Sequence, residues 1–290
     1  MMTRLALGIV WLLRLLPLSL LAPIGQALGM LLYLLARERR FVTLTNLRLC
    51  FPDLSEAQRA RIARAHFRCM GRVLIEQSIA WWSSPRRLLR MVRVEDQQHL
   101  DRALSAPVIV LGMHFVGLEL GAIRLSKDYG MIDLYSHQKD PVFDAVLLKG
   151  RSRFGRSLFL SRQDGIRAVV RAMKDGWSLF YLPDMDLGPK DSIFVPFFGV
   201  PAATVPGLSR IARLTRAHVV PLVIRQLPGG QGYVARFYPA WENFPSDDVA
   251  ADTRRMNAFI EQRVREIPEQ YYWLHKRFKT RPPGEARFYP

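Results

Sequence analysis

The sequence has few cysteines and few acidic residues, and these shortages exclude several kinds of protein. Only two cysteines, Cys50 and Cys69, occur among 290 residues, too few for a disulfide framework or a cysteine-rich zinc site. We expect both thiols to be reduced, on a cytosolic side, with a single disulfide as the alternative. Asp and Glu number 25 against 42 Lys and Arg, which gives a net charge of +17. This excess indicates an anionic partner: nucleic acid, an anionic membrane, or an acidic or phosphorylated ligand.

The chain also lacks the common motifs of nucleotide-dependent and covalent catalysis. It contains no phosphate-binding P-loop and no G-x-S-x-G turn that would present a nucleophilic serine. No internal repeat or low-complexity segment occurs. Because 49% of the residues are apolar, a chain of this length can bury a large core, as one large domain or two small ones.

Charge is nearly absent from the amino-terminal segment. Residues 5–35 carry one charged residue, Arg14, whereas about 20 apolar residues suffice to cross a bilayer. The basic run RERR follows at residues 37–40, and arginines that follow an apolar span are typical of its cytoplasmic flank. A cleaved signal peptide has a shorter apolar region and its charge on the other side.

We therefore predict an uncleaved membrane anchor in residues 1–36 and a catalytic domain in residues 37–290. The anchor either spans the bilayer or lies in its interface, kinked at Pro17 and Pro23. With a membrane anchor present, the basic surface is expected to face anionic headgroups rather than nucleic acid.

From residue 106 onward, strand-like apolar runs alternate with helical periodicities, which predicts an α/β fold with a mostly parallel central sheet flanked by helices. Before this region, Ser55 is expected to cap a long helix that runs to residue 81. The expected strands are 108–112, 131–135, 177–182, 218–224 and 232–238, and the expected helices are 118–126, 141–151, 165–174, 202–214 and 252–266.

The most informative motif is a histidine at the end of an apolar run. Residues 106–119 read APVIVLGMHFVGLE, so that a buried strand ends near His114 and Glu119 follows five residues later. A histidine can take a proton from a hydroxyl near neutral pH, and a nearby carboxylate can hold its tautomer. Five residues along a helix turn about 140°, so the two side chains meet only if His114 precedes the helix. By itself, this spacing fits a core histidine and a surface glutamate equally well.

Two acidic residues follow the strand expected at 177–182. Ligands gather at the carboxyl ends of strands in parallel sheets, so Asp184 and Asp186 are candidates to orient a base or bind a donor's polar groups, and Lys190 to meet a phosphate. The alternative is turn chemistry, because Asp, Gly and Pro are the residues that turns favour.

A dense basic segment, GRSRFGR, occupies residues 150–156 and includes Arg151 and Arg153. Guanidinium groups suit phosphate monoesters and acidic carrier proteins, although helix faces also carry such charges. The apolar segment at 194–201 suits an acyl chain, lipid insertion or a buried core. The tail at 269–282 interleaves aromatic and basic residues, which is typical of a membrane interface or of nucleic-acid binding. Because of the apolar amino terminus, we expect the tail to face the membrane.

Together these segments resemble the late acyltransferases of bacterial lipid A biosynthesis, the lauroyl/myristoyl transferase family. The resemblance covers the apolar amino terminus, His114…Glu119, Gly150-Arg151, LPDMD at 182–186, FVPFFGVPAA at 194–203 and YWLHKRFKTRP at 272–282. The H-x4-D/E motif is shared with glycerolipid acyltransferases, whereas the last three of these segments are more specific to the family.

The resemblance implies a glycerolipid-acyltransferase-like fold and transfer of a fatty acyl group from acyl carrier protein. The acceptor would be the hydroxyl of a 3-hydroxyacyl chain on a lipid A precursor, usually one bearing Kdo. The expected partners are acyl carrier protein, this glycolipid and the anionic inner membrane, with the catalytic domain on the cytoplasmic side, and no nucleic acid. No metal or organic cofactor is expected beyond the phosphopantetheine arm of the donor.

The resemblance also suggests residue roles. His114 would be the general base, and Glu119 would orient it and favour its charged form. Arg151 would bind a phosphate or stabilise the thioester oxyanion, and Asp184 would order the site. Asp186, Arg153 and Lys190 are further substrate-binding candidates.

Two other functions remain open at this point. A glycerolipid or other glycolipid acyltransferase would share the histidine and acid, but glycerolipid acyltransferases typically end a strand in a P-E-G-T-R type sequence, where this chain has Pro183-Asp184-Met185-Asp186. A basic membrane-bound binding protein would leave the histidine and its acid as coincidences.

Overall fold

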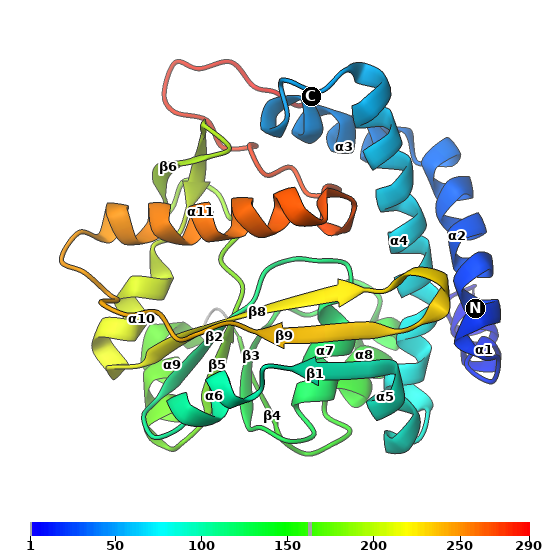
Figure 1. The fold of residues 1–290 in the computed structure, drawn as a ribbon, viewed down its shortest axis with the longest axis horizontal. Helices are drawn as coiled ribbons and strands as arrows, with labels where there is room; N and C mark the ends of the chain where they lie inside the picture. The colour runs from blue at the N-terminus through cyan, green and yellow to red at the C-terminus, as the bar shows by residue number, and fades with distance from the viewer. Residues whose placement is uncertain (1, 162–163) are drawn as a thin grey trace.

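The computed structural model describes residues 2–161 and 164–290. Its centre is a seven-stranded sheet with the order β1-β9-β8-β2-β5-β3-β4, in which neighbouring strands run parallel except for the β8–β9 pair (Figure 1). The mostly parallel sheet predicted from the sequence is therefore confirmed. The strands are β1 (Val92–Glu95), β2 (Val108–Leu111), β3 (Met131–Tyr135), β4 (Ser157–Ser161), β5 (Ser178–Tyr181), β8 (His218–Gln226) and β9 (Tyr233–Phe237).

Helices cover both faces of the sheet. Alternate residues of β2 explain why: Ile109 packs with the core cluster on one face and Val110 with the cluster on the other. A strand buried on both sides is continuously apolar. The helices are α1 (Met2–Leu13), α2 (Leu18–Leu35), α3 (Arg37–Cys50), α4 (Glu56–Trp82), α5 (Pro85–Met91), α6 (Gln98–Ala103), α7 (Leu118–Leu125), α8 (Pro141–Arg151), α9 (Gly165–Lys174), α10 (Gly207–Thr215) and α11 (Val249–Glu266).

The expected strands are all present, but one predicted helix begins in the wrong place. Residues 202–204 belong to a hairpin of β6 (Ile193–Phe197) and β7 (Val200–Thr204), and α10 starts only at Gly207. Phe198 and Gly199 form the turn with φ values of 52° and 80°, as two-residue hairpin turns require. The apolar segment is thus a hairpin whose Phe197 is fully buried. The short strands β1 and β4 were not predicted, because β1 (VRVE) alternates apolar and charged residues and β4 (SLFLS) has only three consecutive apolar residues.

The long helix α4 begins as predicted at Ser55. The Ser55 hydroxyl accepts a hydrogen bond from the Gln58 backbone amide at 3.2 Å, and the Gln58 side chain accepts one from the Ser55 amide at 2.7 Å. This reciprocal arrangement satisfies two amides that the first turn leaves unpaired. Cys50 and Cys69 are free thiols, as expected.

The carboxy-terminal tail differs from the prediction of a membrane-facing aromatic surface. Trp273 and Phe278 are fully buried, and Arg277 is 2% exposed. The guanidinium group of Arg277 donates hydrogen bonds of 2.8 Å to the Ala203 carbonyl and to the Thr204 hydroxyl. The tail aromatics therefore pack the core against the β6–β7 hairpin.

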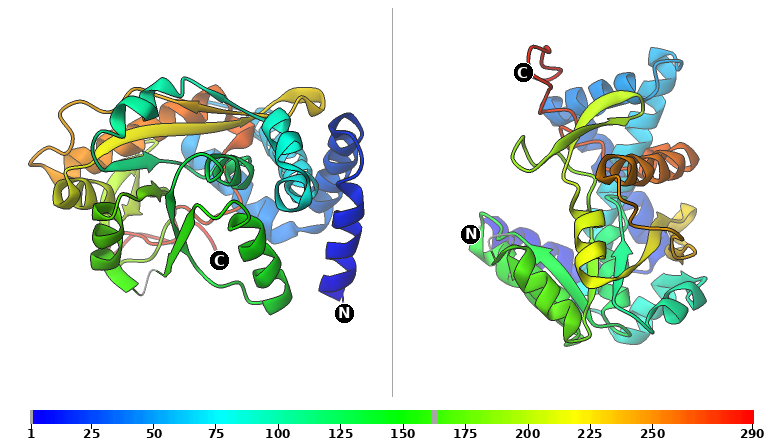
Figure 2. Two further views of the ribbon diagram at one scale, coloured as in Figure 1. Left: turned by 90° about the horizontal axis from the view of Figure 1, so that it is seen from below. Right: turned by 90° about the vertical axis from the view of Figure 1, so that its left-hand side faces the viewer.

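The amino-terminal segment folds as two helices along one edge of the molecule (blue in Figure 2). Helix α2 is long and apolar enough to cross a membrane, but it packs lengthwise against α4. Glycines make this contact: a Cβ atom at Gly29 would lie 2.1 Å from the Phe67 carbonyl oxygen, and one at Gly71 2.2 Å from the Gly25 oxygen. The opposite sides of α1 and α2 expose large apolar side chains, Met2, Leu5, Ile9, Leu12, Leu20, Ile24, Leu31, Leu34 and Leu35.

We expect Gly71→Ala to lower the free energy of unfolding by about 1–3 kcal/mol, because the added methyl group separates α2 from α4. Helix propensity alone would favour alanine by about 1 kcal/mol, so a loss would show that the steric effect dominates. Thermal unfolding of the purified full chain in detergent measures the change. Gly8→Ala is the matched control, since nothing lies within 4 Å of a Cβ atom at Gly8 in α1. Equal stabilisation by both substitutions would contradict the close helix contact.

Candidate active site

The sheet brings His114 and Asp184 together through the register of β2 and β5. Leu111 is the partner of Tyr181 in this parallel pair, and each candidate lies three residues beyond its partner. The Gly112 amide extends the pairing with a 2.9 Å hydrogen bond to the Tyr181 carbonyl. Two loops that leave adjacent strands at the same level therefore place the imidazole beside the carboxylate.

Asp184 holds His114 with both of its carboxylate oxygens. Oδ1 lies 2.6 Å from Nδ1 of the ring, and Oδ2 accepts a 2.9 Å hydrogen bond from the His114 backbone amide. Asp184 is only 1% exposed. Burial by itself would raise the pKa of this carboxyl, but the charge and hydrogen bonds of His114 outweigh it and hold the pKa below its ordinary value. An ionised Asp184 keeps the proton on Nδ1, which leaves Nε2 able to accept one.

The tail fixes the loop that carries His114. Phe115 and Tyr271 form an antiparallel bridge, the Val116 amide donates to the Gln270 carbonyl at 2.8 Å, and the Tyr272 amide donates to the His114 carbonyl at 2.8 Å. These bonds set the loop backbone from a segment far away in the chain.

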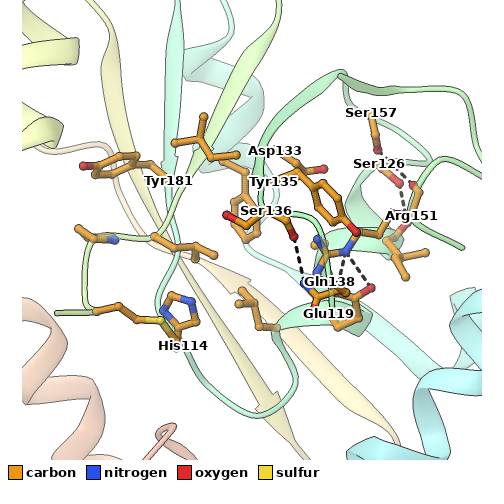
Figure 3. A pocket seen from close by; sticks show the side chains of 18 of the residues that line it. His114, Glu119, Ser126, Asp133, Tyr135, Ser136, Gln138, Arg151, Ser157 and Tyr181 are labelled. Atoms are coloured by element: carbon orange, nitrogen blue, oxygen red, sulfur yellow. Dashed lines mark hydrogen bonds and ion pairs between the residues drawn. The ribbon is translucent and has the colours of Figure 1, made fainter. Parts of the chain in front are cut away.

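His114 lies at the wall of a cavity of about 380 Å³ (Figure 3). The cavity runs between one face of the sheet and helices α7 and α8, and its lining mixes apolar and polar side chains. This size lies within the range of small-molecule sites. Besides His114, the lining includes Leu118, Glu119, Ala122, Ile123, Ser126, Asp133, Tyr135, Gln138, Arg151, Ser157, Phe180, Leu182, Met185 and Leu187.

Glu119 also lines the cavity, but its partner is Arg151. Its carboxylate accepts hydrogen bonds from Arg151 Nε at 3.0 Å and Arg151 Nη2 at 2.5 Å, and one from Trp81 Nε1 at 3.4 Å. The expectation that Glu119 orients His114 was therefore wrong. Glu119 is the second residue of α7, where it faces α8, while the carboxylate on His114 comes from the neighbouring strand.

Arg151 reaches the cavity because its neighbour is a glycine. A Cβ atom at Gly150 would lie 2.3 Å from Cδ1 of Trp81, so α8 can approach α4 closely only without a side chain there. The close approach also brings the Trp81 indole to Glu119. Arg151 and Glu119 thus form an ion pair on the cavity wall, apart from His114 (Figure 3), and the Trp81 indole supports it with a hydrogen bond to Glu119.

Asp186, Arg153 and Lys190 are, like Asp184, absent from the described residues that line this cavity. Asp186 fastens its loop to the tail: its carboxylate accepts hydrogen bonds from the Thr280 amide (2.6 Å) and hydroxyl (2.8 Å) and from the Gly188 amide (2.9 Å). Arg153 donates to the carbonyls of Ala80 and Ser83 at the end of α4. Lys190 is exposed in a turn. The structure thus makes Asp186 and Arg153 fold-forming residues rather than ligands of the cavity.

Sequence reasoning missed Asp133, an acid inside strand β3 that lines the cavity. Burial raises its pKa to about 6, while Arg151 opposes the shift and Glu119 adds to it. The signal was available in the sequence, because an acid inside the strand MIDLY has to face either a partner or a cavity.

Because the pKa of Asp133 is raised above its ordinary value of 3.8, folding favours the protonated form. Stability is therefore lost as pH rises from about 4 to about 6, by up to about 3 kcal/mol. We expect Asp133→Asn to raise the thermal midpoint by several degrees at pH 7.5 and to have little effect near pH 4. Asp53→Asn, at an exposed position, is the control. An equal effect of Asp133→Asn at both pH values would contradict the assignment.

A family model described as "Bacterial lipid A biosynthesis acyltransferase" matches residues 1–280. The Escherichia coli (strain K12) lipid A biosynthesis lauroyltransferase is 36% identical over 286 residues, which cover 98% of this chain and 93% of the relative. The palmitoleoyltransferase of the same organism is 33% identical, over 99% of this chain and 94% of the relative. Its myristoyltransferase is 33% identical, over 92% of this chain and 83% of the relative.

A solved structure, the 1-acyl-sn-glycerophosphate acyltransferase PlsC from Thermotoga maritima, superposes with a TM-score of 0.40 and 14% identity. The superposition covers 80% of this chain and 98% of that chain.

Proposed function

Because this chain belongs to the bacterial lipid A biosynthesis acyltransferase family, we propose that it transfers a fatty acyl group from acyl carrier protein to a lipid A precursor. The acceptor group is the hydroxyl of a 3-hydroxyacyl chain on a Kdo-bearing precursor. The observation that carries the proposal is the His114–Asp184 pair, since it presents an imidazole nitrogen to a cavity of ligand size.

His114 activates the acceptor hydroxyl. Its Nε2 takes the hydroxyl proton while the oxygen attacks the thioester carbonyl and forms the new C–O bond. When the C–S bond breaks, the departing sulfur takes that proton from the imidazolium. Asp184 stabilises the imidazolium between the two steps, because its buried carboxylate lies 2.6 Å from Nδ1. The chain itself supplies both proton transfers.

Arg151 is the candidate for stabilising negative charge in the cavity. Glu119 accepts hydrogen bonds from its Nε and Nη2, which holds the guanidinium plane in place against the cavity wall. An arginine fixed in this way can donate its remaining N–H groups to a phosphate or to the oxyanion of the thioester without reorganising. Glu119 is then a positioning residue for Arg151, and its effect on His114 is indirect.

The position of α1 supports delivery of the acceptor from a membrane. The Thr3 hydroxyl donates a 2.5 Å hydrogen bond to Asp140, two residues beyond the cavity residue Gln138. The same helix exposes Met2, Leu5 and Ile9. A lipid held in the bilayer beside these side chains has a short path to the cavity. The protein would act at the cytoplasmic face of the inner membrane, and the phosphopantetheine arm arrives with the donor, so the protein needs no cofactor of its own.

Mass spectrometry of the reaction products tests the proposal. Purified protein is incubated with Kdo-bearing lipid A precursor and a mixture of acyl carrier protein thioesters. A mass gain of one fatty acyl group supports the proposal and identifies the chain that is transferred. Acylation of a glycerolipid or another glycolipid instead would keep the chemistry and overturn the acceptor, and absence of transfer to any acceptor would overturn the reaction.

A further inference from the structure

A second groove lies on the opposite face of the sheet from the active-site cavity. Arg225 of β8 points to the same side as Val223, which packs in one core cluster, whereas Phe180 of the active-site cavity belongs to the cluster on the other face. The groove encloses about 670 Å³ between α4, the β1–β9–β8 edge and the segment that precedes the tail. Five arginines and two glutamates line it, together with Gln26 of α2.

The sheet register places two of these arginines on the same face of the sheet, one on each side of β9. Arg93 of β1 and Arg225 of β8 are both partners of Val234 in β9, so the two guanidinium groups flank one small apolar side chain on the same face. Arg236, two residues further along β9, is already neutralised by Glu95 at 2.8 Å and Asp96 at 3.3 Å. Within the described residues, neither Arg93 nor Arg225 forms an ion pair.

Helix α4 adds a third unpaired cation. Arg68 is exposed on the groove side and, within residues 2–161 and 164–290, has no ion-pair partner. One turn further on, Arg72 is buried and neutralised by Glu76 at 2.8 Å. Glu269 is the other acid among the described lining residues, and its one negative charge can offset only one of these three arginines. We call the site formed by Arg68, Arg93 and Arg225 the basic groove.

We propose that the basic groove binds the phosphate of an anionic phospholipid headgroup, in a membrane whose surface runs along α2. The guanidinium groups of the groove are the donors that recognise phosphate oxygens. Leu20, Ile24 and Leu31 are exposed on the outer side of α2, the helix whose Gln26 lines the groove. This outer side enters the acyl region, as in helices that lie in a membrane interface.

The level of the groove along α2 argues against a spanning helix. Gln26 lies at the middle of Leu18–Leu35 and lines the groove, and the Cβ position of Gly29 is 2.8 Å from the Cα atom of Arg68. If α2 crossed the bilayer, Arg68 would lie near its centre, where a charged side chain is strongly disfavoured. With α2 in the interface, Arg68 instead lies at the membrane surface, outside the acyl region.

An acidic carrier protein is the other macromolecule that this charge would suit. Its thioester, however, must reach Nε2 of His114, and His114 opens onto the cavity on the opposite side of the sheet. A carrier protein in the basic groove would hold its arm on the wrong face. The groove includes Gln26 of α2, the helix whose outer side exposes apolar residues, and this favours lipid.

Binding of short-chain phosphatidylglycerol to the full-length protein in detergent tests this proposal, with native mass spectrometry as the readout. Two arginines near an anionic headgroup contribute about 1 kcal/mol each, so we expect Arg93→Gln/Arg225→Gln to weaken binding about 30-fold. The matched control is Arg167→Gln/Arg171→Gln, which removes the same charge from exposed positions on α9 and should bind as the unmodified chain does. Thermal midpoints verify that both variants are folded.

Each other result overturns the proposal. Equal retention of short-chain phosphatidylcholine would show that the headgroup charge is not recognised. Equally tight binding of inorganic phosphate would assign the groove to a free anion rather than a lipid. Loss of acyl carrier protein binding in the Arg93→Gln/Arg225→Gln variant, with phosphatidylglycerol binding unchanged, would assign the groove to the carrier protein. Because the readout is lipid binding, the outcome is independent of whether the acyl transfer proposed above takes place.

Discussion

Replacing Asp184 with asparagine is expected to lower the turnover number by roughly 10⁴-fold with the fold intact. The carboxylate now accepts hydrogen bonds from Nδ1 and from the backbone amide of His114. An asparagine has one acceptor oxygen and an NH2 group, so when the oxygen stays on the backbone amide, the NH2 group faces Nδ1. The ring must then carry its proton on Nε2, which is the tautomer that cannot take a proton from the acceptor hydroxyl. Initial rates of acyl transfer measure the loss.

The comparison with Glu119→Gln makes the Asp184 experiment decisive. Glu119 binds Arg151 and Trp81, so its substitution should weaken charge stabilisation in the cavity and leave the tautomer of His114 unchanged. If Asp184→Asn kept a rate close to that of the unmodified enzyme while Glu119→Gln lost all activity, Glu119 rather than Asp184 would be the residue that controls His114. The thermal midpoint of each variant shows whether it is folded, so that a loss of rate from a changed His114 tautomer can be distinguished from a loss by unfolding.

Replacing His114 with alanine should reduce acyl transfer by about 10²- to 10⁴-fold, because general-base catalysis contributes that much. The substitution also leaves Asp184 buried without its ring partner, which lowers stability. His114→Gln is therefore the second variant, since its side-chain amide can still donate to Asp184 but cannot act as a base. Both variants should retain binding of the lipid acceptor, measured by equilibrium binding of the Kdo-bearing precursor.

His218→Ala is the control for the His114 variants, because His218 is exposed at the start of β8 and its substitution should leave the rate unchanged. Robust acyl transfer by folded His114→Gln would contradict the mechanism.

The position of His114 was predictable because it depends on local pattern. The run VIVL is apolar at every position and its four residues are buried in β2, so a strand could be located there and the histidine placed just beyond its end. The same holds for α8, whose predicted and observed bounds agree at Pro141–Arg151, because proline after Asp140 starts a helix and its apolar periodicity continues it.

The partners of these residues were not predictable from local pattern. Glu119 is five residues from His114 and was the nearest acid in the chain, yet Asp184, seventy residues away, forms the contact. That choice depends on β2 and β5 being neighbours in the sheet, which no local periodicity contains. The tail was misjudged for a similar reason: whether Trp273 and Arg277 meet lipid or protein depends on the β6–β7 hairpin that covers them.

The sequence by itself determined the α/β class, the apolar amino-terminal helices and the place of the histidine, since these follow from composition and from the periodicity of neighbouring residues. The resemblance to a family also rested on the sequence alone. Only the tertiary structure decided which carboxylate holds His114, that Arg151 is bound by Glu119, and that α2 lies along α4 through glycine contacts. Those pairings depend on strand order and helix packing, which bring together residues that are far apart in the chain and are fixed by the burial of the whole core.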